Sequence, residues 1–519
     1  MTTATLVHYD QIPYQSGPFR QTHPCQLSVL PILFGLSPPT IRTGRVLELG
    51  CASGGNLIPM APCLPDAEFV GVDLSSRQIA DGCAVVSRLG LKNVELRHAS
   101  IMDVDESFGE FDFILCHGVF SWVPREVQDK ILSIASANLA ADGLCYVSYN
   151  VYPGWHLRGL VRDMMRYHVA GFEDPIDQIQ QSRALLDFLN KSSAPGGAAY
   201  QQLLADEAKI ISRHSDSYLF HEHLEDVNEP LYFHEFVDRA AAAGLAYMGD
   251  ADFSTMLTDV FDADAVSLLR DVPLLRQEQY MDFLRNRTFR SSVICRAGRT
   301  FDRHVTADRL TPCHVALRDP VRLPGSTDGE SEWEVSVGND TLHVSQPCTK
   351  AAVRLLSESW PATVPVQELL SNVGRDRASD QAESSTKVSA EPIVLADLMS
   401  LFTRGLLRVW HDPPLVCAHP GDAPEATALA RLQVQQSDVV TNQWHELVKL
   451  TDLPRAMLPL LDGTRNRSAL ADWLGTAIAR GEFRIRRDTQ PLVDVDAGTV
   501  DEVLDGTLRT LAGNGLLIA

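Results

Sequence analysis

A carboxylate and two glycines stand close together near the start of the chain, in the sequence Glu48-Leu49-Gly50-Cys51-Ala52-Ser53-Gly54. An apolar run comes directly before them, and a second apolar run ends on Asp73. Glycines let a backbone approach a ligand closely, and a helix that starts after them presents free N–H groups. The pattern predicts a strand, a glycine-rich turn, a helix and a second strand, which form the first half of a doubly wound sheet.

Two kinds of nucleotide cofactor fit such a turn. The spacing Gly50-x-Ala52-x-x-Gly55 can be aligned with the dinucleotide fingerprint, with Asp73 as the acid that binds the ribose. Glu48 argues against a dinucleotide, because this carboxylate would face the pyrophosphate. S-adenosylmethionine carries an ammonium and a sulfonium group, so an acid beside the turn favours it, and Asp73 can bind both ribose hydroxyls. We therefore predict S-adenosylmethionine, with a dinucleotide and a purely structural turn as the alternatives.

Further cofactor contacts are expected where later strands end, because open α/β sheets bind ligands at the carboxyl ends of their strands. Predicted strands at 93–98 and 111–116 are followed by short loops. His117 contacts the methionine moiety through its backbone carbonyl in this interpretation, with a role as base as the alternative. The predicted cofactor residues are Glu48, Gly50, Cys51, Ala52, Ser53, Gly54, Asp73, Leu74, Gln78, Ser100, Ile101, His117, Gly118 and, from the N-terminal stretch, His23.

Aromatic and amide side chains follow the fourth strand and a fifth predicted strand at 144–149. We predict that Tyr149 and Asn150 orient the group that accepts the methyl, with Trp122 as a wall of the pocket. An N-terminal lid is expected to complete this pocket, with an N-terminal arm packed on the sheet as the alternative. Each aromatic residue also has a structural interpretation as a core or packing residue. The predicted substrate-pocket residues are Tyr9, Tyr14, Tyr152 and Trp155.

Composition limits the partners and the compartment. The formal charge is 45 − 67 = −22, and no local basic patch is apparent, so nucleic acid is not expected as a partner. None of the ten cysteines forms a Cys-x-x-Cys pair, which is typical of reduced thiols in a cytoplasm. The N-terminus lacks a signal-peptide pattern, and the apolar run Leu27–Leu36 is too short for a membrane span. A cytoplasmic protein without a membrane partner is therefore predicted.

The elements that position these residues predict an α/β fold with a seven-stranded sheet. Helices are expected at 76–89, at 125–140 with a C-cap at Asp142-Gly143, and at 233–243 before Gly244. The sixth and seventh strands are expected at 245–248 and 290–296, with the last one antiparallel. Amphipathic helices at 157–231 form an insertion that can pair subunits, and residues 250–288 make a second excursion. The predicted core therefore comprises residues 1–156 and 232–298.

The pattern changes from residue 299 onward. An order of helix, helix, helix and strand occurs at 351–410 and again at 457–518, where each copy ends in Gly-Leu-Leu. This predicts two winged-helix-like α+β domains, at 299–412 and 425–519. The polar run 374–391 inside the first copy is expected to be a loop or wing. Neither copy has a helix with clustered Lys and Arg, which favours a protein-facing or scaffold role over DNA reading.

Histidines and glutamates at His221-Glu222-His223 and His234-Glu235 invite a metal interpretation. The first two rings lie on different faces of a helical pattern, and the second pair belongs to another helix. Structural or capping roles are therefore predicted, and no metal.

Five motifs together carry a family resemblance: ELGCASGGN, GVDLSSRQI, FILCHGVFSWVP, YVSYNVYPGWH and FHEHLEDVNEPLYFHEF. The chain resembles bacterial methyltransferases that bear a methyltransferase regulatory domain, a group that includes the rickettsial outer-membrane-protein lysine methyltransferases. The resemblance is dense over residues 9–298, with the regulatory-domain-like stretch at 215–298, and weaker beyond. It implies a class I (Rossmann-like) methyltransferase fold, S-adenosylmethionine, a homodimer formed through the inserted helices, and methylation of protein lysines.

The sequence thus predicts an S-adenosylmethionine-dependent methyltransferase that acts on lysine side chains of a protein. A lysine amine, with an ordinary pKa near ~10.4, must lose its proton before it can attack the methyl group. Desolvation and aromatic walls favour the neutral amine. The alternatives are a small-molecule or natural-product methyltransferase and a cofactor-binding regulator without turnover.

Overall fold

A computed structural model describes residues 16–192, 197–321, 323, 333–337, 340–380, 390–484, 486–487, 490–491 and 496–519. The chain divides into two compact units. The first unit contains residues 39–61 and 65–300 together with the N-terminal residues up to Ser16. The second unit contains residues 17–38, 62–64 and 301–519. Residues 17–38 therefore belong to the second unit, although the sequence analysis placed them with the core of the first.

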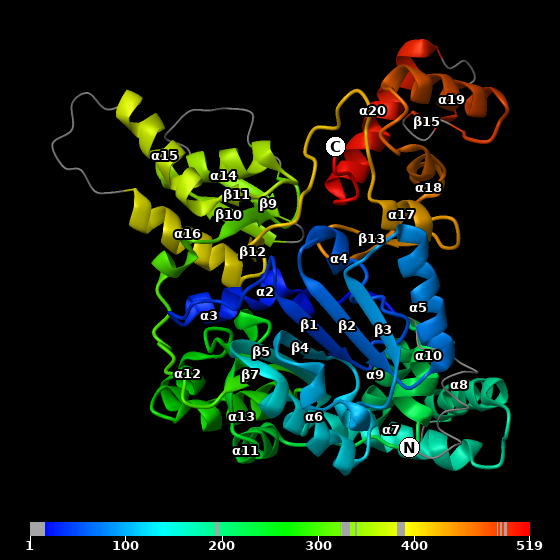
Figure 1. Ribbon diagram of the computed structural model, residues 1–519, viewed down its shortest axis with the longest axis vertical. Coiled ribbons are helices and arrows are strands. Elements are labelled where there is room, and N and C mark those ends of the chain that lie inside the picture. The colour runs from blue at the N-terminus through cyan, green and yellow to red at the C-terminus, as the bar shows by residue number, and fades with distance from the viewer. Residues whose placement is uncertain are drawn as a thin grey trace. The chain divides into compact units, whose positions relative to one another are not determined.

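A seven-stranded sheet organises the first unit, in the order β3-β2-β1-β4-β5-β7-β6 (Figure 1). Strands β1 to β5 are parallel to their neighbours, whereas β7 is antiparallel to both β5 and β6. This confirms the predicted class I sheet. The strands are β1 Arg45–Leu49, β2 Glu68–Asp73, β3 Val94–His98, β4 Phe111–Cys116, β5 Leu139–Asn150, β6 Leu245–Asp250 and β7 Phe289–Arg296.

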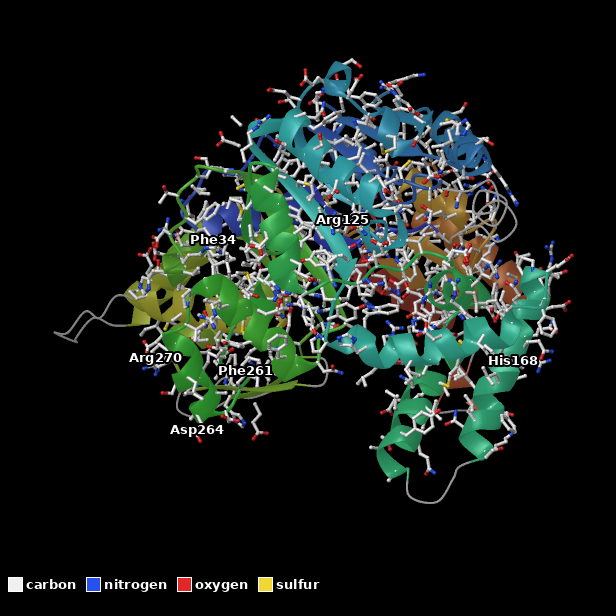
Figure 2. The ribbon with its side chains drawn as sticks, turned by 90° about the horizontal axis from the view of Figure 1, so that it is seen from below. Phe34, Arg125, His168, Phe261, Asp264 and Arg270 are labelled. Atoms are coloured by element: carbon white, nitrogen blue, oxygen red, sulfur yellow. The ribbon has the colours of Figure 1, made fainter. Side chains whose placement is uncertain are left out.

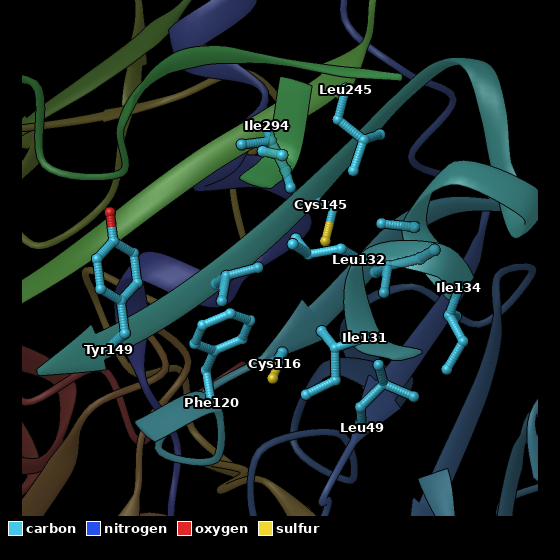
Figure 3. Packing of buried hydrophobic residues seen from close by; sticks show 14 of the residues in the cluster. Leu49, Cys116, Phe120, Ile131, Leu132, Ile134, Cys145, Tyr149, Leu245 and Ile294 are labelled. Carbon is cyan, nitrogen blue, oxygen red and sulfur yellow. The ribbon is translucent and has the colours of Figure 1, made fainter. Parts of the chain in front are cut away.

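Three helices cover this sheet close to the predicted positions: α5 Ser76–Leu89, α6 Arg125–Asn138 and α11 Phe233–Ala242. Helix α5 begins because the Ser75 side chain accepts the backbone N–H of Gln78, and it ends at Gly90 with φ 67°. A large apolar cluster fills the layer between the sheet and helices α6 and α11 (Figure 3). It contains Leu49, Phe120, Ile131 and Ile294.

The segment after β1 differs from the prediction. No helix starts directly after the glycine-rich turn; residues 51–59 form consecutive turns, and the short helix α4 covers only Met60–Cys63. This segment contains three prolines, Pro59, Pro62 and Pro65. Because proline has no N–H to donate within a helix, a longer helix cannot form here. The backbone N–H groups beside the predicted cofactor therefore come from turns.

The end of α6 also differs from the prediction. The helix ends at Asn138, and Asp142 and Gly143 lie inside β5. Phe111 pairs with Leu139 and Phe113 pairs with Leu144, so an irregularity in β5 absorbs the extra residues. Gly143 is required there, because a Cβ atom would lie 2.8 Å from the Leu139 side chain.

The predicted helical insertion consists of α7 Gly154–Val169, α8 Pro175–Lys191, α9 Ala198–Ser212, α10 Asp216–Leu219 and the π-helix η5 Phe220–Leu224. A separate apolar cluster that includes Val161, Met165 and Phe220 holds these helices together. The second excursion contains η6 Phe253–Met256, α12 Ala263–Arg270 and α13 Leu274–Arg285. The insertion, with His168, and α12, with Asp264 and Arg270, lie on opposite sides of the first unit in both views (Figure 1, Figure 2).

A buried ion cluster attaches α13 to the sheet. Arg290 of β7 is 0% exposed and pairs with Asp250, Glu278 and Asp282 at N–O distances of 3.1, 2.9 and 2.9 Å. Arg287 adds a contact of 2.8 Å to Asp250. Burial raises the pKa of Glu278 to about 7, although Arg290 opposes the shift.

The second unit contains two successive groups of elements. Its first part holds η7 Ala307–Leu310, the sheet β11-β8-β12 (Val364–Pro365, His314–Leu317, Leu407–Trp410), the hairpin of β9 Trp333–Val337 and β10 Asp340–Val344, and helices α14 Pro347–Ser359, α15 Val366–Asp380 and α16 Glu391–Thr403. Its second part holds α17 Ala428–Gln433, β13 Val439–Thr441, β14 Leu447–Lys449, α18 Asp452–Met457, η8 Leu458–Leu460, α19 Arg467–Ala479, β15 Arg486–Arg487, β16 Gln490–Pro491 and α20 Ala497–Gly513. The polar run predicted as a loop begins inside α15, and residues 381–389 lie outside the described part.

The N-terminal elements η1 Arg20–Thr22, α2 Pro24–Leu27 and α3 Val29–Leu33 belong to this second unit. The Gln26 side chain donates to the Val409 carbonyl at 3.1 Å, and the His411 N–H donates to the Cys25 carbonyl. No helix within the described residues is long and apolar enough to span a bilayer.

Candidate functional site

The turn after β1 is held in an unusual backbone conformation. Gly50 has φ 76° and donates its N–H to the Val72 carbonyl at 2.9 Å. A Cβ atom on Gly50 would lie 2.5 Å from the Val119 side chain, so only glycine fits. Ala52 has φ 49°, which costs about 1 kcal/mol for a residue other than glycine, and its N–H donates to Asp73 Oδ2 at 2.8 Å. This hydrogen bond stabilises Ala52 in a left-handed conformation that alanine disfavours.

Asp73 ends β2 and joins the turn to helix α5. Its Oδ2 accepts the Ala52 N–H and its Oδ1 accepts the Ser75 N–H, both at 2.8 Å. Burial raises the pKa of Asp73, although these backbone N–H groups oppose the shift. Each carboxylate oxygen has a second lone pair, so Asp73 can still accept two hydroxyl groups of a ribose. Leu74 and Gln78 follow it, and Gln78 is buried at 6% exposure.

Glu48 lies on β1 and is 4% exposed. Its neighbours Leu47 and Leu49 point into the apolar cluster, so by strand alternation Glu48 faces the opposite side of the sheet. Its Oε1 accepts the Asn56 Nδ2–H at 2.8 Å, whereas its buried Oε2 has no hydrogen-bond partner in the described chain. Burial raises the pKa of Glu48 to about 8. An unsatisfied buried carboxylate oxygen fits a cationic group such as the ammonium of S-adenosylmethionine.

The remaining turn residues pack tightly on β3 and α5. Cys51 is buried, and a Cβ on Gly54 would lie 3.0 Å from the Leu96 side chain. Ser53 contributes a carbonyl oxygen that lies 2.6 Å from the position of a Cβ on Gly82. Ser100 and Ile101 follow β3, where the Ser100 side chain caps the short helix η2 Ile101–Asp103. Both residues are partly exposed, as an adenine-binding loop requires.

His117 and Gly118 follow β4. His117 Nδ1 lies 2.9 Å from the Tyr146 hydroxyl, which in turn donates to Ser291 Oγ at 2.9 Å. Burial lowers the pKa of His117 to about 3, so the ring is neutral at pH 7. Gly118 has φ 66°, donates its N–H to Ser148 Oγ at 2.8 Å, and has no atom within 4 Å of a Cβ position. The backbone at Gly118 is therefore open to a ligand.

The side chains of Tyr149 and Asn150 point to opposite faces of β5, because successive residues of a strand alternate. Tyr149 is 1% exposed and belongs to the apolar cluster (Figure 3). Its ring stacks on Phe236, with 4.2 Å between the ring centroids. Its hydroxyl lies 2.9 Å from Ser292 Oγ. Tyr149 is therefore packed in the core, as its structural interpretation expects.

Asn150 lies on the face that carries Tyr146 and Ser148, which contact His117 and Gly118. It is 3% exposed, and its Nδ2–H donates to Asn228 Oδ1 at 3.0 Å. Its backbone N–H donates to the Ser121 side chain at 2.9 Å. The structure thus fixes Asn150 beside the loop that follows β4.

Two aromatic groups belong to the segments that follow β4 and β5. Trp122, in the short helix η4 Phe120–Trp122, meets Trp155 edge-to-face at 6.0 Å. Trp155 is 2% exposed, and its Nε1–H has no partner in the described chain. Tyr152 stacks on His156 at 4.0 Å and lies 5.3 Å from Tyr232. The structure therefore brings Trp122 and Trp155 together and places Tyr152 in a second, neighbouring aromatic group.

Three predicted site residues remain: His23, Tyr9 and Tyr14. His23 belongs to the second unit, where it packs 5.7 Å from Trp410 and 5.3 Å from His445, and burial lowers its pKa to about 4. Its Nδ1 accepts the Cys25 N–H at the start of α2, so it is a packing and capping residue rather than part of the turn around Glu48. Tyr9 and Tyr14 lie outside the described residues.

The histidine-rich stretch has internal partners. His221 Nδ1 lies 3.0 Å from Glu225 Oε1, and His234 Nδ1 lies 3.0 Å from Gln279 Oε1. Within the described ranges, no three His, Cys, Asp or Glu side chains are grouped as a metal site would require.

Four contributors to the site were missed by the sequence analysis: Asn56, Tyr146, Ser148 and Asn228. Ser148 and Tyr146 lie two and four residues before Asn150 in β5. Because every second residue of a strand points to the same face, the sequence could have indicated both. Asn56 is eight residues after Glu48, and its contact depends on turns that no local pattern indicates. Asn228 is 78 residues from Asn150 and carries no local signal.

Three family models match the chain: a "Methyltransferase domain" at 47–145, a "Predicted methyltransferase regulatory domain" at 215–296, and a "PKMT, C-terminal winged helix domain" at 422–516. The chain is 34% identical over 533 residues to the uncharacterized protein RP789 of Rickettsia prowazekii, and the match covers 100% of this chain and 95% of that protein. It is 43% identical over 234 residues to RP028 of the same organism, which covers 45% of this chain.

The fold also matches a solved structure over nearly its whole length. This is PKMT2 from Rickettsia typhi in complex with AdoHcy, at 30% identity and a TM-score of 0.86, with 98% of this chain and 100% of that chain covered. The turn, the acid after β2 and the unsatisfied carboxylate of Glu48 agree with S-adenosylmethionine as the cofactor. The chain therefore belongs to the S-adenosylmethionine-dependent class I methyltransferases that carry a methyltransferase regulatory domain and a PKMT C-terminal winged helix.

Proposed function

We propose that this methyltransferase modifies lysine side chains of a protein substrate. The observation that carries the proposal is the position of Asn150, a buried amide held at the end of β5 on the face that contacts His117 and Gly118. An amide oxygen can accept an N–H of an amine, and the Trp122–Trp155 pair offers an apolar wall for an aliphatic lysine stem. The name PKMT, which stands for protein lysine methyltransferase, supports the same substrate class in the relative from Rickettsia typhi.

S-adenosylmethionine, when bound, supplies an electrophilic methyl group. In this proposal Glu48 binds the ammonium group, Asp73 binds the ribose, and Ser100 and Ile101 border the adenine. The chain's own contribution to the reaction is to hold a neutral amine in a dry pocket. A lysine amine has an ordinary pKa near ~10.4, and burial beside tryptophan rings lowers it because the charged form is disfavoured.

Positioning then supplies most of the rate enhancement that the protein provides. The neutral ring of His117 adds no second positive charge beside the cofactor's cation. Its Nδ1 faces the Tyr146 hydroxyl, so we assign His117 a structural and backbone role rather than that of a general base.

Transfer of a labelled methyl group tests the proposal. The purified chain is incubated with tritiated S-adenosylmethionine and a bacterial cell extract that has been separated into a protein fraction and a small-molecule fraction. Acid hydrolysis of the labelled protein should release labelled methyl-lysine. Label that enters only small molecules would instead identify a small-molecule methyltransferase, and cofactor binding without any labelled product would identify a non-catalytic regulator.

A variant at Asn150 links the label to the proposed site. Asn150→Ala should lower incorporation by at least tenfold, because the amine loses an oriented acceptor, while calorimetry should find S-adenosylhomocysteine bound as tightly as before. Asn190→Ala is the matched control. Its amide donates to the Leu186 carbonyl within α8, so its loss should leave incorporation unchanged.

A further inference from the structure

The segment Glu225–Leu231 connects the π-helix η5 to α11 and lies within the matched regulatory domain. Its C-terminal part is fastened to the end of β5. The Leu231 N–H donates to the Asn150 carbonyl at 3.2 Å, and Val151 forms a parallel bridge with Leu231. The Glu229 N–H donates to the Ser121 carbonyl at 2.8 Å. This segment therefore borders the proposed acceptor site, although the sequence analysis counted it with the helical insertion.

The N-terminal part of the segment is fastened to α7. Arg162 and Arg166 both donate to the Glu225 carbonyl, and Arg166 also pairs with the Asp226 carboxylate at 3.0 Å. His221 Nδ1 lies 3.0 Å from Glu225 Oε1. Because both ends are held, the residues between them have little freedom to move relative to β5.

Asn228 lies between these two anchors and contacts Asn150 directly. The Asn150 Nδ2–H donates to Asn228 Oδ1 at 3.0 Å. An amide has a donor side and an acceptor side of nearly equal size. In this bond the donor side of Asn150 faces Asn228, so Asn150 Oδ1 is directed away from Asn228.

This orientation matters for an amine acceptor. An amine that donates an N–H to Asn150 Oδ1 keeps its lone pair for the methyl group. If the amide of Asn150 turned over, its NH2 group would face the amine and compete for that lone pair. A hydrogen bond from the wrong side would lower the nucleophilicity of the amine as well as its affinity.

We propose that Asn228 is a positioning residue, supplied by the regulatory domain, that fixes the amide of Asn150 with its oxygen toward a lysine amine. The inference rests on the proposed function. It assigns the regulatory domain a direct part in the acceptor site, which none of the matched descriptions states.

Two cofactor analogues isolate this effect without a protein substrate. Both are derivatives of S-adenosylhomocysteine that carry a short arm in place of the methyl group: one arm ends in an amine and the other is an alkyl arm of equal length. The ratio of their dissociation constants measures the preference for the amine alone. Any general loss of cofactor affinity cancels in this ratio.

The native protein should prefer the amine arm by about tenfold, the effect of one hydrogen bond in a desolvated site. Asn228→Ala should reduce this preference to less than threefold, with the affinity for S-adenosylhomocysteine unchanged. Asn228→Asp retains an acceptor for the Asn150 N–H and should preserve the preference. Asn190→Ala, the matched control on α8, should preserve it too.

Each contrary outcome has a distinct meaning. An Asn228→Ala variant that keeps the full amine preference refutes the positioning role. Loss of the preference in Asn228→Asp as well, with S-adenosylhomocysteine still bound, also refutes it, because the accepting oxygen is then not what matters. A native protein that does not prefer the amine arm refutes the proposed lysine acceptor itself, and the inference fails with it. If Asn228→Ala does not fold, loss of the preference in Asn228→Asp still refutes the role.

Discussion

Substitution of Glu48 by glutamine should weaken cofactor binding and, at pH 8, increase the stability of the cofactor-free fold. Glu48 is buried, one of its oxygens is satisfied by Asn56, and the other has no partner in the described chain. Burial raises its pKa to about 8, so in the cofactor-free protein this carboxyl is mostly protonated at pH 7. A bound ammonium favours the ionised form. Protons and cofactor therefore compete at Glu48.

The size of the pH effect on cofactor binding follows from the ionisation of two groups. Tight binding needs the Glu48 carboxylate, with a pKa of about 8, and the cofactor's ammonium, with an α-amino pKa of about 7.7–8.0. The fraction with both groups charged rises about 20-fold between pH 6 and pH 8 and falls again at higher pH. Glu48→Gln removes the charge-assisted bond, which is worth about 1.5–3 kcal/mol, or roughly 10- to 100-fold in affinity at pH 8. At pH 6 the native protein and the variant should differ little.

Calorimetric titration with S-adenosylmethionine between pH 6 and pH 9 checks these values. 5′-Methylthioadenosine, which has the nucleoside but no amino acid, is the control ligand, and its affinity should be the same at every pH for both proteins. The reasoning is refuted if Glu48→Gln binds S-adenosylmethionine as tightly as the native protein at pH 8, or if both show the same rise with pH.

Stability should change in the opposite direction. The pKa of Glu48 in the folded protein, about 8, is above that of an unfolded glutamate, so folding favours the protonated form. Its contribution to stability is therefore complete below pH ~4.3 and declines as pH rises to about 8, by up to roughly 5 kcal/mol. Without cofactor, Glu48→Gln should unfold at a higher temperature than the native protein at pH 8 and at the same temperature at pH 4.

Four further predictions concern other parts of the first unit. Asp73→Ala should weaken S-adenosylmethionine binding by at least 100-fold in calorimetry, because the ribose partner and the clamp on the turn are both lost; near-native binding would mean that the ribose is misplaced. Gly118→Ala should weaken cofactor binding at least tenfold, whereas Gly90→Ala, with nearly the same backbone angle and equally open space, should cost about 1 kcal/mol of stability and leave binding unchanged. Arg290→Met should lower the free energy of unfolding in urea by about 3–5 kcal/mol, because three buried carboxyl groups lose their partner; a loss below 1 kcal/mol would contradict this. Tyr167→Glu, at a side chain 88% exposed on the helical insertion, should shift the expected homodimer to monomer in light scattering, and an unchanged mass would argue against that interface.

Much of the fold was predictable because its signals are local. Strands β1, β2 and β4 are short, mainly apolar segments. Helix α5 has a serine N-cap and a glycine C-cap in its own sequence. The two misjudged boundaries have different causes, and only the second is non-local. Residues 51–59 form turns because prolines interrupt the segment. Asp142-Gly143 resembles a helix cap but lies in strand β5, which is held by its pairing with β4. Local propensity was overridden there by tertiary pairing.

The cofactor half of the site was more accessible to sequence analysis than the acceptor half. Glu48 and Asp73 lie at strand ends, where position alone indicates function, and the structure brings both to one turn. Tyr149 was predicted together with Asn150 because the two are neighbours in sequence, but adjacency in a strand means opposite faces. The packing of His23 carries no local signal, because Trp410 and His445 follow it by 410 − 23 = 387 and 445 − 23 = 422 residues.

The N-terminal helices α2 and α3 have a consequence for how the chain is made. Gln26 finds its partner Val409 only after 383 further residues have been synthesised, which takes about 20–75 s at ~5–20 residues per second. Leu27, Leu30 and Leu33, almost fully buried in the finished protein, leave the ribosome long before the elements that cover them. These helices are thus translated early and enclosed late, and the nascent polypeptide carries an exposed apolar segment during most of translation.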